Sequence, residues 1–297
     1  MNVILSALVP VTFIISIGII AGRTLTLDRS TLSQLAVYIL TPALIASSLY
    51  KTQLSTDSAL GLIVGYLITC VLVYGVSLGI STLLKLKSGV QKSFIATSMF
   101  ANTGNMGLPF ATFALGEGGL DRAIVCLIVS TLIIFSTGPA LLQGGSFGES
   151  LRLIIRLPLI WAMVVGLTLR FFSIDLPLRL DDGLHLLGGA AIPIALIVLG
   201  IQLSTTAFKI GLYEGVTAII RLLVSPAIAY SVGRSLGLEV LDVQVLILQS
   251  AMPTAVNTVV LVTQFGGDAS WAARTVVLST ALSLVTLPLV LWATLML

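Results

Sequence analysis

Apolar stretches of about 20 residues recur from one end of the chain to the other, and this pattern constrains the fold more than any other feature. A stretch of that length spans the hydrocarbon core of a bilayer as a helix. Composition agrees, because 9% of the residues are charged, whereas soluble domains have about 25%. Disorder, a coiled coil and a disulfide-stapled secreted module are excluded. The sequence predicts an all-α polytopic membrane protein.

The hydropathy pattern predicts ten transmembrane spans. They cover residues 3–22, 32–50, 59–84, 91–115, 122–142, 154–172, 185–204, 214–235, 241–266 and 271–295. Ten spans of about 21 residues use roughly 210 residues, which leaves no room for a sizeable soluble domain. Function is therefore expected inside the membrane. Breaks are expected in two glycine-rich segments, 116–119 and 144–148.

The basic residues predict the orientation. The loops after odd-numbered spans hold nine Lys and Arg, and the loops after even-numbered spans hold five. By the positive-inside rule, the odd-numbered loops are cytoplasmic and both termini lie on the non-cytoplasmic side. The net charge of +3 is spread along the chain without a basic patch, so no nucleic-acid partner is expected.

Prolines indicate an internal repeat. They recur at offsets of 148, 151 and 149 residues as the pairs Pro10 and Pro158, Pro42 and Pro193, Pro139 and Pro288. The repeat would divide the chain into five-span units at residues 1–145 and 146–297. Because five is odd, the second unit enters the membrane from the opposite side, and such inverted repeats are typical of secondary transporters. Shared apolar composition is the alternative explanation.

The fourth and ninth spans carry matching polar residues at mid-span. The two sets have the same i, i+4, i+7 spacing, 152 residues apart: Ser98, Asn102, Asn105 and Ser250, Thr254, Asn257. Pro109 and Pro253 predict that both helices are broken. Free N–H groups at broken helix ends hold an anion without any Lys or Arg. The alternative is that these polar residues only join helices together.

The segment Asn102–Pro109 resembles the signature of the auxin efflux carrier family, and the segment around Pro253 and Asn257 is also similar to it. Bacterial members include malate and malonate permeases, and plant members include auxin exporters. The resemblance covers the whole chain. More distantly, the layout is similar to bile acid:sodium symporters.

The resemblance implies a mechanism. The broken spans would cross near Pro109 and Pro253, with Asn105 and Asn257 beside a substrate carboxylate. A scaffold (1–50 with 154–206) would hold a transport domain (59–143 with 214–297) that moves as an elevator, and scaffold helices would join a homodimer. The substrate-binding residues implied are Asn102, Thr103, Asn105, Pro109, Pro253, Thr254 and Asn257. The implied location is a prokaryotic inner membrane.

The energy source is left open by the sequence. No Walker motif is present, so ATP is excluded. No Asp or Glu lies deep in a span, which disfavours a proton relay. The membrane potential, about 2.3 kcal/mol per charge per 100 mV, is one remaining option. The other is sodium coupling through the oxygens of Ser98, Gln249 and Ser250. No cofactor is expected beyond a coupling ion, Na+ or H+.

Ionisable residues inside or beside spans need an interpretation. Arg221 lies seven residues after Glu214, so an ion pair between them or snorkelling is expected, with attraction of an anionic substrate as the alternative. Arg122 and Arg274 match across the repeat, and we expect structural or interfacial roles. His185 is interpreted as interfacial.

The function predicted is a secondary carrier of small organic anions, such as malate, malonate or auxin-like aromatic acids. A sodium-coupled symporter of organic anions is the alternative. A channel or a receptor ranks lower. An intramembrane enzyme is disfavoured, because there is no His-Glu-x-x-His motif and only one histidine.

Overall fold

The computed structural model describes residues 2–143, 147–205, 211–264 and 266–297. All of the named secondary-structure elements in these residues are helices. The first helices are α1 (Asn2–Thr24), α2 (Arg29–Leu35), η1 (Ala36–Leu40), α3 (Thr41–Lys51), α4 (Thr56–Leu83), α5 (Ser88–Met99), η2 (Thr103–Gly107) and α6 (Leu108–Gln143). The remaining helices are α7 (Phe147–Ile155), α8 (Pro158–Phe171), η3 (Pro177–Arg179), α9 (Leu180–Gly189), α10 (Ala191–Thr205), α11 (Leu212–Ile219), η4 (Ile220–Val224), α12 (Ser225–Ser235), α13 (Val240–Ser250), α14 (Asn257–Gln264) and α15 (Ala269–Thr294).

Seven helical segments among the described residues are long and apolar enough to cross a membrane. They are Ile4–Thr24, Arg29–Lys51, Thr56–Leu83, Thr103–Ser136, Pro177–Ser204, Leu212–Ser235 and Ala269–Thr294. Two shorter apolar helices, α8 and α13, lie within other predicted spans. The prediction of an all-helical membrane protein is confirmed, and the count of ten spans stays a prediction.

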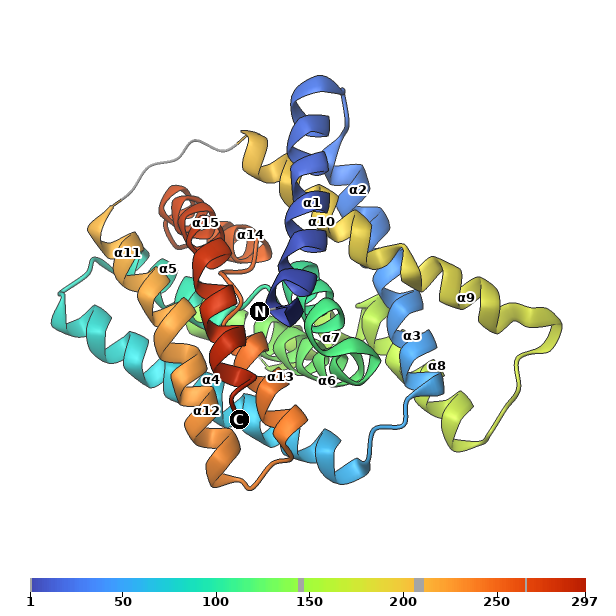
Figure 1. The fold of residues 1–297 in the computed structure, drawn as a ribbon. Helices are drawn as coiled ribbons and strands as arrows, with labels where there is room; N and C mark the ends of the chain where they lie inside the picture. Colours follow the sequence, from blue (N-terminus) through green and yellow to red (C-terminus); the bar gives the residue numbers. More distant parts are fainter. Residues whose placement is uncertain (1, 144–146, 206–210, 265) are drawn as a thin grey trace.

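The helices form two groups (Figure 1). In one group, α1 packs along α10, and α3 packs against α8 and α9. In the other, α12 packs against α13 and α4, and α11 packs against α15. The long helix α6 lies between the groups and contacts α1 on one side and α13 and α4 on the other.

Glycines allow the closest helix approach in the first group. A Cβ atom on Gly18 of α1 would overlap the carbonyl oxygen of Ile197 on α10, and Gly200 faces Gly18 across the same contact. A Cβ atom on Gly166 of α8 would lie 2.8 Å from the carbonyl oxygen of Ala46 on α3. Only hydrogen fits at these positions, so the glycines set how closely the backbones approach.

Three π-helical turns each precede a proline. The turns η1, η2 and η4 lie just before Pro42, Pro109 and Pro226. A proline inside a helix lacks an N–H group and clashes with the carbonyl of the preceding turn. One extra residue per turn relieves both problems, which explains why these helices continue past their prolines.

The structure confirms one of the two breaks that were predicted in glycine-rich segments. Gly116 interrupts α6 with φ 69° and ψ −160°, a backbone conformation open to glycine, so the break expected at 116–119 is confirmed. Residues 144–146 of the second predicted break lie outside the described residues. Helix α7, which follows, was not expected, because glycines at 144, 145 and 148 obscure the helical pattern.

Candidate functional site

Two interrupted helices lie at the centre of the molecule. Helix α5 ends at Met99 and the chain resumes a helix at Thr103, while α13 ends at Ser250 and α14 begins at Asn257. The second interruption contains Pro253, where a break was predicted. The first lies at 100–102, before Pro109, and the helix continues through Pro109, so the break predicted at that proline is displaced toward the N-terminus. Each interruption leaves backbone N–H and C=O groups without an intrahelical partner.

The two interruptions satisfy these groups by pairing with each other. Ala101 and Thr254 form an antiparallel bridge. The N–H of Asn102 donates to the carbonyl of Pro253 at 2.8 Å, and the N–H of Ala255 donates to the carbonyl of Phe100 at 2.8 Å. Non-helical backbone is thus tolerated here because protein supplies the partners that a bilayer lacks.

A cavity of about 360 Å³ lies beside this pairing. Its lining combines the ends of both interrupted helices with one face of the segment from α2 to α3. The polar lining residues are Asn102, Thr103, Asn105, Asn257, Ser130, Thr131, Ser30, Ser33, Gln34, Tyr38 and Thr41. None of the described lining residues is charged, so the cavity offers neutral donors and acceptors only.

The N-termini of both resumed helices lie at the cavity, because Thr103 and Asn257 begin them and line it. Helix N-termini carry partial positive charge and free N–H groups. Asn102 adds a buried side-chain Nδ2 that has no hydrogen-bond partner, although buried amides are normally paired. Asn257 is exposed and Asn105 half-buried. The arrangement suits an anionic group held by hydrogen bonds.

The other predicted substrate-binding residues lie behind the lining. Pro253 contributes its carbonyl to the pairing, and Pro109 is buried near the start of α6. The Thr254 hydroxyl donates to the carbonyl of Thr97 at 2.8 Å, and its N–H donates to the Ser279 hydroxyl at 3.2 Å. The structure thus brings Asn102, Thr103, Asn105 and Asn257 together at the cavity.

The residues predicted to bind a cation are buried near the paired interruptions. Gln249 donates from Nε2 to the carbonyl of Gly107 at 2.9 Å and so joins the two interrupted helices. The hydroxyls of Ser98 and Ser250 are buried and have no hydrogen-bond partner. The backbone carbonyls of both serines accept hydrogen bonds from Arg221.

The predicted ion pair between Arg221 and Glu214 is wrong. Glu214 instead accepts a hydrogen bond from Arg274 at 2.9 Å. The turn η4 begins one residue before Arg221, and its wider turn shifts the face on which Arg221 lies. Arg221 is buried, which also excludes snorkelling to the interface.

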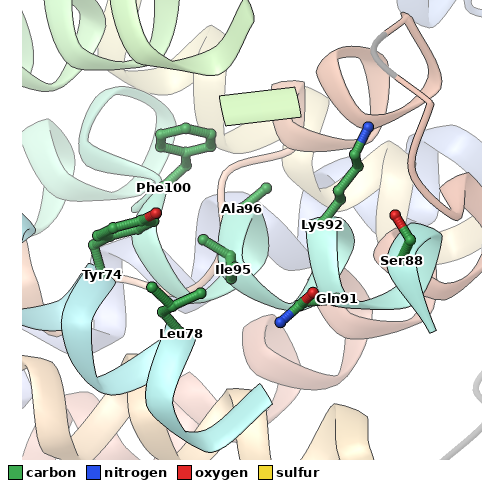
Figure 2. A pocket seen from close by; sticks show the side chains of 8 residues that line it. All are labelled: Tyr74, Leu78, Ser88, Gln91, Lys92, Ile95, Ala96 and Phe100. Carbon is green, nitrogen blue, oxygen red and sulfur yellow. The ribbon is translucent and has the colours of Figure 1, made fainter. Parts of the chain in front are cut away.

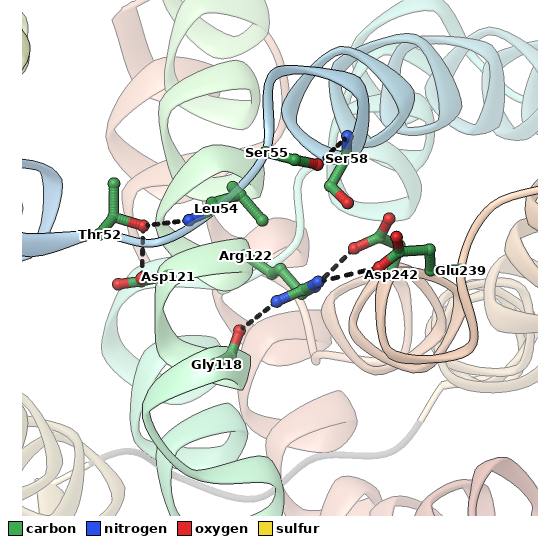
Figure 3. Close-up of polar contacts among 9 residues, drawn as sticks. All are labelled: Thr52, Leu54, Ser55, Ser58, Gly118, Asp121, Arg122, Glu239 and Asp242. Atoms are coloured by element: carbon green, nitrogen blue, oxygen red, sulfur yellow. Dashed lines mark hydrogen bonds and ion pairs between the residues drawn. The ribbon is translucent and has the colours of Figure 1, made fainter. Parts of the chain in front are cut away.

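The other ionisable residues join helices or lie at the surface. Arg122 donates to Asp242 at 2.5 Å, to Glu239 at 3.5 Å and to the carbonyl of Gly118 at 3.2 Å (Figure 3). Arg122 and Arg274 therefore have the structural roles that we expected. His185 lies exposed on α9.

One polar contact was missed by the sequence analysis. Asp121 on α6 accepts hydrogen bonds from the hydroxyls of Ser48, at 2.5 Å, and Thr52 at the end of α3. Figure 3 shows the bond from Thr52. These bonds connect α6 with the group of helices that contains α3. No motif marks them in the sequence, because the two segments are far apart along the chain.

A second cavity of about 230 Å³ lies between α4 and α5 (Figure 2). Its lining includes Lys92, Gln91 and Ser88 of α5 and Tyr74 and Leu78 of α4. None of the residues that begin the resumed helices lines it. The first cavity is therefore the better candidate for a transport site.

The polar face of α2 was also missed, although the sequence contains a signal for it. The face continues from α2 through η1 to the start of α3. Apart from the neighbours Ser33 and Gln34, its residues follow one another at spacings of three or four, which place them on one helical face: Ser30, Ser33, Gln34, Tyr38 and Thr41. All five line the first cavity. A search for polar helical faces outside the two broken spans would have found them.

Comparison with known proteins places the chain among membrane transporters. Residues 3–149 and 146–291 match the family described as "Membrane transport protein". An uncharacterized transporter of Methanocaldococcus jannaschii is 32% identical over 70% of each chain. An uncharacterized transporter of Methanothermobacter thermautotrophicus is 29% identical over 88% of each chain. A Rhizobium meliloti protein named "Putative malonate transporter" is 25% identical over 86% of this chain and 83% of its own.

These matches are to transporters and not to enzymes. They cover both halves of the chain, and the resemblance that the segment Asn102–Pro109 indicated is confirmed. The chain belongs to the membrane transport protein family, which contains the auxin efflux carriers.

Proposed function

We propose that the protein is a secondary carrier that moves small organic anions across the membrane by alternating access. The anion would bind in the cavity beside the paired interruptions. One observation carries the proposal: two helix N-termini and several neutral amide and hydroxyl groups converge on a cavity whose described lining residues are all uncharged. Carboxylates such as malonate, malate or auxin-like aromatic acids fit this chemistry.

The donors of the cavity suit a carboxylate in particular. A carboxylate accepts several hydrogen bonds at once, and bonds to a charged acceptor are stronger than neutral ones. Free N–H groups at Thr103 and Asn257, with the amides of Asn102 and Asn105, supply such donors around one space. Acidic residues, which would repel the substrate, are absent from the described lining. The name of the Rhizobium meliloti relative makes malonate the first compound to test.

The two groups of helices support an elevator mechanism. We propose that residues 1–50 with 154–206 form the scaffold and that residues 59–143 with 214–297 form the transport domain. The cavity lies between them, because α2, α3 and α8 line one side and η2, α6 and α14 line the other. A substrate held there would cross the membrane when one group slides along the other.

Matching glycine contacts support the inverted repeat behind this mechanism. Gly18 in the first unit contacts α10 of the second, and its counterpart Gly166 in the second unit contacts α3 of the first. An inverted pair of units exchanges contacts in this way around a pseudo-twofold axis. We propose that the units span residues 1–145 and 146–297, and that scaffold helices join two copies in a homodimer.

The distribution of charge suggests which side the cavity faces. Ser30 and Ser33 of α2 and Leu157 before α8 line it, and these residues follow the loops that the positive-inside rule places in the cytoplasm. At the other end of α3, Ser48 and Thr52 bind Asp121. We propose that the cavity opens to the cytoplasm of an inner membrane, with both termini on the opposite side.

Thermal unfolding of the purified protein with malonate tests the proposed site. We expect malonate to raise the melting temperature of the wild type and to have a much smaller effect on Asn105→Ala and Asn257→Ala. A hydrogen bond to a charged group contributes about 1.5–3 kcal/mol, so each substitution should weaken binding about 10- to 100-fold. Thr263→Ala is the matched control, since Thr263 is exposed on the same helix α14 but does not line the cavity.

Two results would overturn parts of this proposal. If malonate raised the melting temperature of all four proteins equally, the anion would bind outside this cavity. Flux without saturation or counterflow in proteoliposomes would favour a channel over a carrier.

A further inference from the structure

Arg221 lies where the first halves of both interrupted helices end. Its side chain is 3% exposed. Nη1 donates to the carbonyl oxygens of Ser98 at 3.0 Å and Met99 at 2.9 Å. Nη2 donates to the carbonyl oxygen of Ser250 and, at 2.6 Å, to the hydroxyl of Ser225. One guanidinium therefore joins the last turns of α5 and α13.

The carbonyls that Arg221 binds form a negative region within the membrane. The last carbonyls of a helix lack intrahelical partners, and the helix dipole gives that end a partial negative charge. Helices α5 and α13 bring two such ends to one buried place. Clustered carbonyl oxygens are also the ligands that hard cations prefer, and half-helix C-termini hold Na+ in secondary transporters.

No carboxylate neutralises Arg221 among the residues that the structure describes. The ion pairs of this part of the chain do not include it. Glu214, the nearest acidic residue along the chain, pairs with Arg274. The hydrogen bonds of Arg221 go to neutral oxygens only. The helix ends thus supply the negative charge that a buried cation requires.

We propose that Arg221 is a built-in cation that takes the place of a coupling sodium ion. The guanidinium satisfies the carbonyls of Ser98, Met99 and Ser250, which would otherwise be available to a sodium ion. It also positions the backbone that leads from Met99 to Asn102 at the cavity. The consequence for transport, that uptake or export of the anion needs no sodium gradient, rests on the proposed function.

The assignment itself is tested without any organic anion. The melting temperature of purified protein is measured in sodium chloride and in choline chloride at equal ionic strength, with and without a few millimolar guanidinium chloride. We expect the wild type to be indifferent to all these salts. We expect Arg221→Ala to melt at a lower temperature and to gain a rise of about 4 °C or more with guanidinium or sodium. Arg221→Lys, which keeps a positive charge, should stay indifferent to sodium.

Arg234→Ala is the matched control, because Arg234 is exposed on α12, the helix that follows η4. It should show no response to either cation. Sodium stabilisation of the wild type, or an Arg221→Ala protein that no cation stabilises, would overturn the proposal. If Arg221→Ala does not fold, Arg221→Gln replaces it, and the same rise of its melting temperature with sodium or guanidinium is required. If malonate does not bind the wild type, the proposed function fails, but the responses of these variants to sodium and guanidinium still test the role of Arg221.

Discussion

The polar side chains that line the cavity are neutral, and this makes anion binding sensitive to the charge of single residues. Asn102, Asn105 and Asn257 line the cavity without any charged neighbour among the described lining residues. A neutral site binds an anion only through oriented dipoles, so it is sensitive to any new negative charge. An amide is also close in shape to a carboxylate, which allows that sensitivity to be tested with little change in volume.

We predict that Asn105→Asp abolishes binding of malonate. Two like charges about 4 Å apart repel by about 4 kcal/mol at an effective dielectric constant of 20, which corresponds to about a thousandfold loss of affinity. Isothermal titration at neutral pH measures the effect, with Asn105→Ala for comparison. Binding by Asn105→Asp that equals or exceeds that of Asn105→Ala would show that the anion lies elsewhere.

The pair of Arg122 and Asp242 predicts a large effect on stability. Asp242 is 1% exposed and lies 2.5 Å from Nε of Arg122. Breaking a buried pair costs about 3–5 kcal/mol, and without Asp242 the largely buried guanidinium of Arg122 keeps only the exposed Glu239 as an ion-pair partner. We therefore expect Asp242→Ala to lower the melting temperature strongly. Glu239→Gln should change it little, since Glu239 is 71% exposed at its side chain and lies 3.5 Å from the same arginine.

The sequence predicted the neutral site residues better than it predicted their charged neighbours. Polar residues at the middle of the fourth and ninth spans already marked Asn102, Asn105 and Asn257 as candidates, each within its own span, because composition and helical spacing are local. The partners of Arg221 and Glu214 depend on a π-helical turn and on helices distant in the chain. A helical period of 3.6 residues cannot predict that Arg221 lies on a different face of its helix, because the π-helical turn and the distant partners arise from tertiary packing.

At the scale of elements, the contact between α1 and α10 depends on the absence of side chains. We predict that Gly18→Leu destabilises the protein by about 1–3 kcal/mol, since overpacking forces the backbones apart. Gly75→Ala on α4 is the control, because a Cβ atom there meets no atom within 4 Å. It should be neutral or stabilise by up to about 1 kcal/mol through helix propensity. Thermal unfolding of both variants decides, and an unchanged Gly18→Leu would contradict this account of the contact.

The elements show how far sequence reasoning reaches in a membrane protein. Long apolar runs predicted the helices, whereas the close contact at Gly18 is seen only in the structure. The interruption at 251–256 was predicted from Pro253 and the polar residues beside it, whereas the one at 100–102 lies ahead of Pro109, through which the helix continues. The sequence did not predict that the two interruptions pair with each other through Ala101 and Thr254, because this pairing depends on how two distant segments meet.

At the scale of the whole molecule, the proposed elevator requires contacts that break as it moves. Asp121 lies in the proposed transport domain, and its hydrogen-bond partners Ser48 and Thr52 lie at the end of α3 on the scaffold side. These bonds close the end of the molecule opposite Ser30 and Ser33, which line the cavity. They should therefore stabilise the state that faces the cytoplasm relative to the state that faces outward.

We predict that Asp121→Ala increases the population of the outward-facing state. Loss of two hydrogen bonds to a carboxylate removes about 1.5–3 kcal/mol for each bond from the observed state, so the ratio of states should shift at least tenfold. Asn257→Cys reports the state, because Asn257 lines the cavity. The background is free of cysteine after Cys70→Ala and Cys126→Ala, which replace the free thiols of the described residues.

A membrane-impermeant thiol reagent applied to either side of the membrane then reads the two populations. In the background with Asp121 intact, labelling of Asn257→Cys should be fast from the cytoplasmic side and slow from outside. Asp121→Ala should raise the outside rate about tenfold, whereas Glu117→Gln, a change at an exposed carboxyl on the same helix α6, should not. Fast labelling from outside with Asp121 intact would reverse the orientation that the Lys and Arg counts predict. Equal rates with and without Asp121 would show that the hydrogen bonds from Ser48 and Thr52 do not hold the carrier in one state.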